Sequence, residues 1–389
     1  MDKFVEKASL CALNRIFGFE PKIAAALIEH FGSAAEVMKQ KQDEMDLLLG
    51  PYSKYSGQIG RHSLEKASRE LEEIEKKGIR FTGITEESYP NMLRECEDPP
   101  IGLYVRSSTP LDSLFALRKG IAIVGTRDSS LYGEEWCKKT VASMATLPEK
   151  PAVVSGLALG IDACAHRTAL ENGIPTIAVM ATGPDTIYPW RNRGIAEQIV
   201  SSSGCALITD YPPGTAPLAV HFLRRNRIIA GLSDATLLIE SKMRGGGMMT
   251  ARLAFSYGRE VFALPGRADD IRSQGCNHLI KSKIAEPITS IDGLFKDLGF
   301  KAASGRQSVP CGEAVSQRYR NMLPEDKIDR MAAILTVIRK HRGITIEETA
   351  METGMKYSTA AELTGILETD GFISIDLLQR CTINFRNNM

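Results

Sequence analysis

Hydrophobic residues follow three successive patterns along the chain. In residues 1–80 they recur at spacings of three and four, the period of helices that bury one face. Between 81 and 300 they form short β-branched or aliphatic runs, separated by amphipathic stretches of helix length. In residues 325–389 the helical period returns and is followed by two short strand-like runs. The pattern predicts three folded parts.

The central part carries six short apolar runs, which we interpret as strands buried on both faces. Between most of them lie amphipathic stretches, such as 134–144, 159–171 and 248–257, that predict helices. Strands that alternate with helices predict a doubly wound, mostly parallel α/β sheet over residues 81–300. The six expected strands are 121–124, 152–154, 176–179, 206–208, 236–239 and 261–264.

The flanking parts predict smaller modules. Breaks at Gly18–Pro21 and Phe31–Ser33 divide the N-terminal helices, as in SAM-like or helix-hairpin-helix modules, which contact DNA in some proteins and only pack in others. Residues 301–324 are rich in Ser, Gly, Pro and Gln and predict a linker. Three helices and two strands within 325–389 predict a winged helix.

Composition narrows the class of protein. The formal net charge is +1, so binding of a polyanion would depend on local clustering of cations. The eight cysteines form no CxxC pair and no Cys/His ligand spacing, which predicts reduced thiols and no metal site. The charged start, MDKFVEKASL, predicts no signal peptide, and no apolar run is long enough to span a bilayer. We expect a cytoplasmic protein with no membrane partner.

Three glycine-rich loops follow predicted strands. They are Gly125–Ser130, Ser155–Asp162 and Glu240–Gly247. In a parallel sheet such loops meet at one edge, where glycines let the backbone approach an anion and hydroxyl or arginine side chains add hydrogen bonds. Each loop alone could be merely a tight turn between a strand and a helix. Three loops at one edge favour an anion site.

A nucleotide cofactor is disfavoured by the details of these loops. The first loop is not GxGxxG, and no clear acidic residue ends the second strand to bind a ribose. The Walker A sequence GxxxxGK[ST] is also absent. We therefore expect no cofactor.

The densest cationic signal is the segment His221–Ser233, in which Arg224, Arg225, Asn226 and Arg227 precede an apolar helical run. Residues 221–283 contain eleven Lys and Arg against five Asp and Glu, a local excess of six positive charges. Cations at a helix start oppose the helix dipole, which suggests that an external anion compensates them. A solvated helix start with internal ion pairs is the alternative, and polyanion binding is favoured over it.

Two isolated features are weaker candidates. Asp162 and His166 share a helix face and could perform acid–base chemistry, although a local hydrogen bond that fixes the loop is the preferred interpretation. Tyr188-Pro189-Trp190 offers aromatic rings that could stack on a base, and a packed turn explains it equally well. No GxSxG sequence occurs, so no serine nucleophile is predicted.

Several segments match, in order, motifs of the DprA/Smf family of bacterial DNA-processing proteins. The chain resembles that family over about 80–295, and its flanking parts resemble accessory domains of the family. It departs from the usual pattern at Thr126, at Leu223 and at Gly245–Met249, which puts the loop shapes in question. The matching segments are Ile121–Arg127, Val154–His166, Tyr188–Pro189, Asp210–Pro212, Arg225–Ser233, Thr250–Ala251, Pro265–Gly266 and Gly275–Ile280.

The resemblance implies a Rossmann-like domain that binds single-stranded DNA. It also implies protection of incoming DNA in natural transformation, loading of RecA recombinase onto the strand, and a homodimer formed through the Rossmann-like domain. By motif position, Arg127, the Ser155–Gly156 loop and Arg225–Arg227 correspond to the family's DNA pocket. Together with the glycine loops, the predicted DNA-binding residues are Gly125, Thr126, Arg127, Ser155, Gly156, Arg224, Arg225, Asn226, Arg227, Gly245, Gly246 and Gly247.

The main alternative is a hydrolase acting on a phosphorylated nucleoside, like the lysine-decarboxylase-like phosphoribohydrolases. Those enzymes carry a PGGxGTxxE-type motif with a catalytic Glu. Here Gly245–Thr250 is followed by Ala251-Arg252-Leu253, with no Glu at the matching place. We therefore expect a binding protein with no catalytic residue.

Overall fold

The computed structural model describes residues 2–115, 119–300, 315–316, 318–320, 322–341, 343–376 and 379–383. Most of the predicted linker 301–324, together with Cys311 and the predicted strand residues Asn384 and Phe385, lies outside the described residues. The chain divides into two compact units, unit 1 over Met1–Ala302 and unit 2 over Ala303–Met389.

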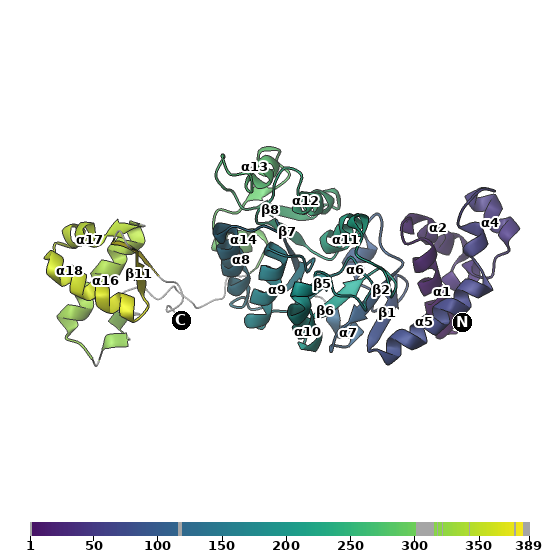
Figure 1. The fold of residues 1–389 in the computed structure, drawn as a ribbon, viewed down its shortest axis with the longest axis horizontal. Coiled ribbons are helices and arrows are strands. Elements are labelled where there is room, and N and C mark those ends of the chain that lie inside the picture. The colour runs from purple at the N-terminus through teal and green to yellow at the C-terminus, as the bar shows by residue number, and fades with distance from the viewer. Residues whose placement is uncertain are drawn as a thin grey trace. The chain divides into compact units, whose positions relative to one another are not determined.

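Unit 1 is built around a nine-stranded sheet in the order β1-β2-β6-β5-β4-β3-β7-β8-β9 (Figure 1). From β6 to β9 neighbouring strands are parallel, while β2 pairs antiparallel with β6 and β1 antiparallel with β2. The α/β class with a mostly parallel sheet is therefore confirmed. The strands are β1 Ile79–Gly83, β2 Gly102–Arg106, β3 Gly120–Val124, β4 Ala152–Ser155, β5 Thr176–Val179, β6 Ala206–Thr209, β7 Ala235–Leu238, β8 Glu260–Ala263 and β9 Glu286–Pro287.

All six predicted strands are present, each within one residue of its expected bounds. The sequence pattern missed β1, β2 and β9. Strands β1 and β2 carry polar residues such as Arg80, Thr82 and Arg106 beside their buried positions. Strand β1 therefore lacks a continuous apolar run, whereas β2 contains the short apolar run Leu103–Val105, which was not recognised as a strand.

Helices cover both faces of the parallel strands. One face packs against α11 and α12 through residues such as Ile228 and Met248. The other packs against α8, α9 and α10, with Val141 and Ala196 among the buried contacts. The helices of this part are α6 Asn91–Arg94, α7 Leu111–Leu114, α8 Leu131–Met144, α9 Ile161–Glu171, α10 Arg193–Ser201, α11 Ala219–Gly231, α12 Gly246–Ser256, α13 Gln274–Lys281 and α14 Ile291–Asp297, with a 3-10 turn η2 at Trp190–Asn192.

The N-terminal helices share a core with the antiparallel edge of the sheet. Leu10 and Phe17 of α1 and Leu71 of α5 are buried in one cluster with Phe81 of β1 and Tyr104 of β2. In Figure 1 this bundle lies beside β1 and β2. Its helices are α1 Lys3–Ile16, α2 Pro21–Phe31, α3 Ala34–Val37, α4 Gln42–Leu49 and α5 Arg61–Lys76, with a 3-10 turn η1 at Ser56–Gln58.

The described residues of unit 2 include the helices α16, α17 and α18 and a small antiparallel sheet, β10-β12-β11. Thr345 and Glu348 form a capping box that starts α17, and Gly354 ends it in the left-handed conformation, with φ of 67°. Met331, Leu363 and Ile373 lie in its core. Its elements are α16 Glu325–Lys340, α17 Ile346–Thr353, α18 Tyr357–Thr369, β10 Ile344–Thr345, β11 Ile373–Ile375 and β12 Arg380–Ile383.

In the part of the chain that the structure describes, no helix is both long enough and apolar enough to cross a membrane. Within the same residues no cysteine is joined in a disulfide.

Candidate nucleic-acid interface

The three glycine loops meet at the edge formed by the carboxyl ends of the parallel strands. They follow β3, β4 and β7, which are parallel, so their ends lie on one side of the sheet. The amide of Thr126 donates to the carbonyl oxygen of Glu240 at 2.7 Å, and the amide of Ile161 donates to that of Thr126 at 3.2 Å. The structure therefore brings the predicted loops into direct contact.

Some of the glycines are required by this contact between loops. Gly160 has a φ of +75°, and a Cβ there would lie 2.3 Å from the carbonyl oxygen of Thr126. A Cβ on Gly125 would lie 3.1 Å from the carbonyl oxygen of Glu240, at the start of the third loop. Close backbone packing therefore explains part of the glycine content without an anion.

The positive start of α8, the helix after the first loop, is neutralised by a carboxylate of the protein itself. The carboxylate of Glu240 is buried and accepts a 2.9 Å hydrogen bond from the amide of Ser130, the residue that caps α8. The hydroxyl of Ser130 also donates to Glu240. A carboxylate at a helix start satisfies the free amides and the dipole that an external anion would use. The start of α8 is thus already occupied by a negative charge.

Arg225 is buried and holds the second loop. Its Nη1 donates to the carbonyl oxygen of Gly156 at 2.5 Å and to the carbonyl oxygen of Val179. Burial lowers the pKa of Arg225 to about 10, although Asp162 opposes that shift. A Cβ on Gly156 would lie 2.4 Å from Nη1 of Arg225, so glycine is needed there.

Asp162 and His166 have separate partners. The Oδ2 of Asp162 accepts from the amides of Gly156 and Ala158 at 3.2 and 3.4 Å, which fixes the loop. Burial raises the pKa of Asp162, partly offset by Arg225. The Nδ1 of His166 lies 2.7 Å from the hydroxyl of Thr176, and burial lowers the pKa of His166 to about 3. Both groups are buried within the fold, so the structure assigns them no acid–base pair.

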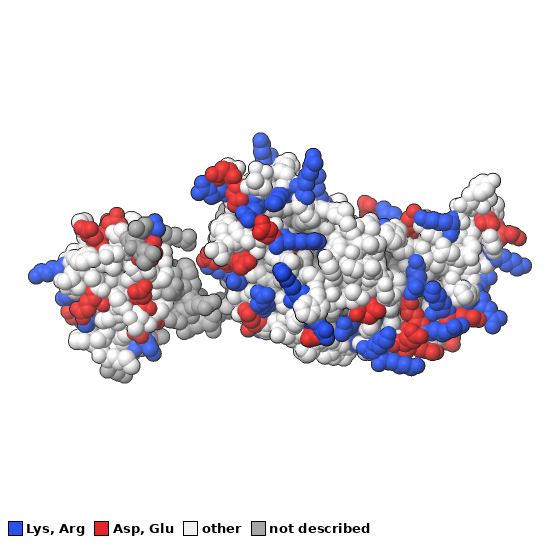
Figure 2. Space-filling view, in the orientation of Figure 1, with Lys and Arg blue, Asp and Glu red and all other residues white. Residues whose placement is uncertain are grey.

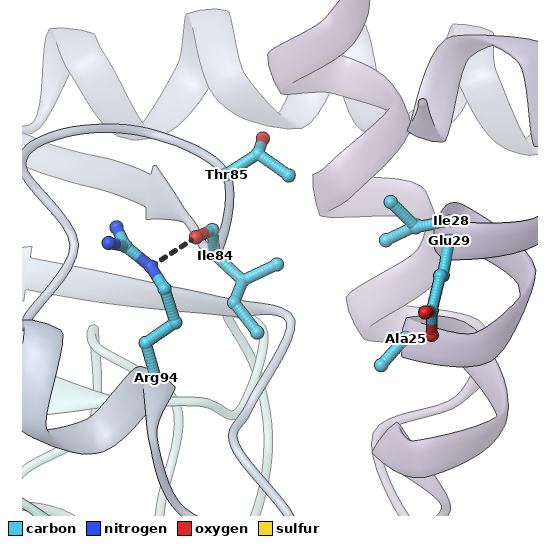
Figure 3. A pocket seen from close by; sticks show the side chains of 6 residues that line it. All are labelled: Ala25, Ile28, Glu29, Ile84, Thr85 and Arg94. Atoms are coloured by element: carbon cyan, nitrogen blue, oxygen red, sulfur yellow. Dashed lines mark hydrogen bonds between the residues drawn. The ribbon is translucent and has the colours of Figure 1, made fainter. Parts of the chain in front are cut away.

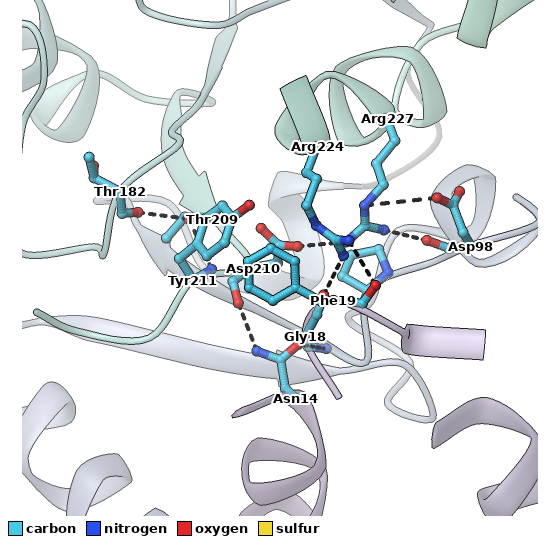
Figure 4. Close-up of polar contacts among 12 residues, drawn as sticks. Asn14, Gly18, Phe19, Asp98, Thr182, Thr209, Asp210, Tyr211, Arg224 and Arg227 are labelled. Atoms are coloured by element: carbon cyan, nitrogen blue, oxygen red, sulfur yellow. Dashed lines mark hydrogen bonds and ion pairs between the residues drawn. The ribbon is translucent and has the colours of Figure 1, made fainter. Parts of the chain in front are cut away.

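Arg224 and Arg227 are also held by the protein (Figure 4). Arg227 pairs with Asp210 at 2.6 Å, and both side chains are nearly buried. Burial disfavours its charge, but Asp210 and Asp98 outweigh that effect and raise the pKa of Arg227. Arg224 donates to the carbonyl oxygens of Gly18 and Phe19 at 2.6 and 2.7 Å, and its guanidinium lies 4.3 Å from the Phe19 ring centroid.

The expectation that these arginines oppose a helix dipole is wrong. Helix α11 begins at Ala219, so the Arg224–Arg227 cluster lies in its interior. The charge of Arg227 is compensated by Asp210, an acidic side chain from the loop after β6. Sequence spacing alone could not reveal this partner.

Ser155 and Asn226 are likewise turned inward. Ser155 donates from its hydroxyl to the carbonyl oxygen of Ile123 at 2.6 Å. The amide nitrogen of Asn226 lies 3.5 Å from the carbonyl oxygen of Gly246, beside the third loop. Each ties one structural element of the edge to another.

Arg127 is the exposed cation at the centre of the edge. Its guanidinium carbon lies 5.2 Å from the ring centroid of Phe222, a cation–π contact. The Phe222 ring in turn lies 5.5 Å from the ring of Tyr188, at an interplanar angle of 61°. Tyr188 is 44% exposed and Trp190 is 74% exposed. Phe222 was not among the predicted binding residues, although it lies two residues before Arg224 within the basic segment.

Further exposed cations follow β7. Lys242 and Arg244 are exposed, and neither forms an ion pair with another described residue. They precede the predicted Gly245–Gly247, of which Gly246 is exposed and has open space around its Cα. Figure 2 shows Lys and Arg side chains projecting from the part of unit 1 that carries α12 and α13. These cations widen the positive surface around the third loop.

A separate cavity of about 640 Å³ lies between α2 and the turn after β1 (Figure 3). Its lining is largely apolar, and the guanidinium of Arg94 there is engaged by the carbonyl oxygens of Ile84 and Glu86, at 2.9 and 2.7 Å. This cavity offers no unpaired cation to an anion. Among the described residues, no group of His, Cys, Asp or Glu side chains is arranged to bind a metal.

Known proteins share both the sequence and the fold of this chain. A family model described as DNA recombination-mediator protein A matches residues 80–299. Protein Smf of Synechocystis sp. is 34% identical over 299 residues, which are 76% of this chain and 73% of that protein. DNA processing protein DprA of Streptococcus pneumoniae is 39% identical over 217 residues, 56% of this chain and 73% of that protein.

Two solved structures are also similar. The X-ray structure of DNA processing protein A from Streptococcus pneumoniae matches with a TM-score of 0.59 at 29% identity, over 77% of this chain and 96% of that one. A structure reported for the single-stranded DNA binding mode of DNA processing protein A from Helicobacter pylori matches with a TM-score of 0.50 at 29% identity, over 57% and 97%. These matches confirm the resemblance inferred from the ordered motifs.

Proposed function

The chain belongs to the DNA recombination-mediator protein A family, and from that premise we propose that it binds single-stranded DNA at the edge carrying Arg127 and Phe222. The observation that carries this proposal is the stack of the exposed Arg127 and Tyr188 on either side of the half-buried Phe222. A cation beside aromatic rings suits a single strand, because phosphates seek the charge and unpaired bases stack on the rings. The Helicobacter pylori relative, described as a single-stranded-DNA binder, supports the same assignment.

The predicted binding residues divide into two groups in this proposal. Arg127 contacts phosphate, and the backbone at the exposed Gly246 and the half-buried Thr126 and Gly245 approaches the strand. The others hold the loops that present these groups, as their internal hydrogen bonds and close packing support. They are Gly125, Ser155, Gly156, Arg224, Arg225, Asn226, Arg227 and Gly247.

The bound strand is incoming DNA in natural transformation, which the protein protects and onto which it loads RecA recombinase in the cytoplasm. The description of the family as a recombination mediator supports this role. In the same proposal the protein acts as a homodimer joined through its Rossmann-like domain.

The edge binds DNA without catalysing a reaction or using a cofactor. The buried carboxylates at the edge serve the fold. Asp162 and Glu240 accept hydrogen bonds from loop amides, and Asp210 pairs with Arg227. Residues 251–253 supply no acid after the third loop. Cleavage of nucleoside monophosphates by the purified protein would instead favour the hydrolase alternative.

The domain organisation that accompanies this function is a SAM- or helix-hairpin-helix-like module over 1–80, the Rossmann-like domain over 81–300, a linker over 301–324 and a winged helix over 325–389. Three helices and a small sheet in unit 2 support the last assignment. Helix α18 contains Glu362 and Glu368 and no Lys or Arg, which favours contact with protein over contact with DNA.

An oligo(dT) titration at two salt concentrations tests the function. The affinity of the wild type should fall steeply with salt, because cations released from the strand accompany binding. Arg127→Ala should weaken binding and flatten the salt dependence, whereas Arg61→Ala on α5 removes an equally exposed arginine far along the chain and should change neither. Equal binding by Arg127→Ala and the wild type would place the site elsewhere.

A further inference from the structure

A second cleft in unit 1 is lined by cationic side chains. Its volume is about 560 Å³, and it runs along one face of α5. Arg15 of α1 and Pro213, from the segment after β6, complete its walls. The residues of α5 and its C-cap that line it with a basic side chain are His62, Lys66, Arg69 and Lys77.

One of the two acids in the cleft is already neutralised. The carboxylate of Glu70 pairs with Arg15 and accepts a 2.6 Å hydrogen bond from the hydroxyl of Tyr104. Its side chain is only 11% exposed. Glu70 and Arg15 therefore cancel, and the free charge of the cleft is set by the remaining side chains.

Those side chains leave the cleft positive. The remaining charged residues of the lining are Lys66, Arg69 and Lys77, which are cationic, and Glu73, which is acidic. Among these described residues, cations therefore exceed acids by two. All three cations are exposed, and only Arg69 has an ion pair, at 4.0 Å from Glu65. Acidic and basic side chains mix over the α5 part of the surface (Figure 2), and the other acids of α5, Glu65, Glu72 and Glu75, are not among the residues that line the cleft.

One segment of the chain links a wall of the cleft to the edge that carries Arg127. Tyr211 lies two residues before Pro213, and its ring is 4.4 Å from that of His221. His221 immediately precedes Phe222, on which Arg127 stacks. One short segment, from Tyr211 to Phe222, thus forms both a wall of the cleft and the aromatic part of the edge.

We propose that the α5 cleft is a second phosphate-binding subsite, into which a strand bound at the Arg127–Phe222 edge continues. The inference rests on the proposed function and extends it. Lys and Arg side chains bind phosphate, while the lining contains no Phe, Tyr or Trp for base stacking. The subsite therefore holds the backbone of the strand without regard to sequence. Free phosphate compounds share this chemistry, and the experiment separates them from a strand.

The test compares short and long strands on a matched pair of variants of the full chain. Lys66→Gln with Lys77→Gln removes two exposed cations of the cleft. Arg61→Gln with Lys76→Gln removes two exposed cations of the same helix that do not line it. Oligo(dT) of about 6 and about 30 nucleotides is titrated, because single-strand sites span roughly 4–16 nucleotides per binding fold.

The cleft variant should bind the long strand roughly tenfold more weakly and with a salt slope smaller by about 1.4, the loss of two phosphate contacts. Its affinity for the short strand, and both affinities of the control variant, should match the wild type. An undiminished affinity of the cleft variant for the long strand would overturn the inference. Failure of the wild type to bind even the short strand would instead overturn the proposed function.

A second experiment uses inorganic pyrophosphate to test whether the cleft binds free phosphate compounds. Pyrophosphate should bind the wild type too weakly to compete with the long strand at equal phosphate concentration. Tight pyrophosphate binding that is lost in the cleft variant, with strand affinity unchanged, would make the cleft a site for free phosphate compounds and contradict its role on the strand.

Discussion

Nη1 of Arg225 lies 2.5 Å from the carbonyl oxygen of Gly156, so a buried guanidinium from α11 clamps the loop that follows β4. The same guanidinium reaches the carbonyl oxygen of Val179 at the end of β5. A buried charge is tolerated when its hydrogen bonds are satisfied and an opposite charge lies near, which Asp162 supplies here. Arg225 thus fixes the shape of the edge, and in the proposed function it contributes to DNA binding through that shape.

Gly156→Ala should therefore destabilise the protein. The added Cβ would lie within 2.6 Å of three guanidinium atoms that burial prevents from moving aside. We expect a loss of about 1–3 kcal/mol in the free energy of unfolding, measured by urea denaturation. Gly194→Ala, where no heavy atom lies within 4 Å, is the matched control and should be neutral or stabilising. Equal stability of the two variants would contradict the clamp.

Asp210→Asn should be costly for a related reason. Arg227 and Asp210 pair at 2.6 Å with side chains 6% and 5% exposed, so the substitution leaves a buried guanidinium without its counter-charge. The expected loss is about 3 kcal/mol in chemical denaturation. Asp269→Asn breaks an ion pair with Arg267 in which the side chains are 82% and 72% exposed, and it should leave the unfolding midpoint unchanged. A neutral Asp210→Asn would show that the pair does not support α11.

Arg224→Ala separates a structural role from DNA contact. The substitution removes two hydrogen bonds to the turn between α1 and α2 and the contact with Phe19. We expect stability to fall by about 1–2 kcal/mol. The salt slope of oligo(dT) binding should stay at the wild-type value, as it should for the Arg61→Ala control. A slope reduced by about 0.7 would mean that Arg224 contacts a phosphate directly.

Much of this architecture could be predicted from the sequence, because parallel strands that are buried on both faces consist of continuous aliphatic residues. All six such runs became strands, and the ordered motifs identified the family. Strand β1 was missed because Arg80 and Thr82 alternate with its apolar residues, whereas the apolar run Leu103–Val105 of β2 was present in the sequence and was overlooked. Local pattern also places the basic motif at a helix start, whereas α11 begins five residues earlier at Ala219.

The candidate site was harder to predict than the fold. Local charge identified the Arg224–Arg227 cluster, but the partners of its charges come from distant segments. Asp210 lies 17 residues before Arg227, and Gly18 lies 206 residues before Arg224. Without these contacts, a buried arginine and an exposed one look alike in sequence. The structure leaves Arg127 exposed and encloses Arg225, which changes the expected role of each.

His166 should make stability depend on pH. Burial, aided by the positive charge of Arg225, lowers the pKa of His166 from its ordinary 6.5 to about 3. Between those values the unfolded chain binds a proton that the folded chain does not, so stability falls as pH falls, by about 1.4 kcal/mol per pH unit. His166→Gln removes this contribution. From about pH 7 to about pH 5, the wild type should lose about 2 kcal/mol more than the variant in urea denaturation. Parallel pH profiles would show that His166 is protonated in the folded protein.

Photochemical cross-linking tests the central claim most directly. Oligo(dT) carrying bromouracil is bound to the full chain and irradiated, and the cross-linked peptides are identified by mass spectrometry. We predict cross-links at the exposed Tyr188 and the half-buried Phe222, the rings beside Arg127, and a lower yield there in Arg127→Ala than in Arg61→Ala. Cross-links confined to residues of unit 2, with none at the Arg127–Phe222 edge, would contradict that claim.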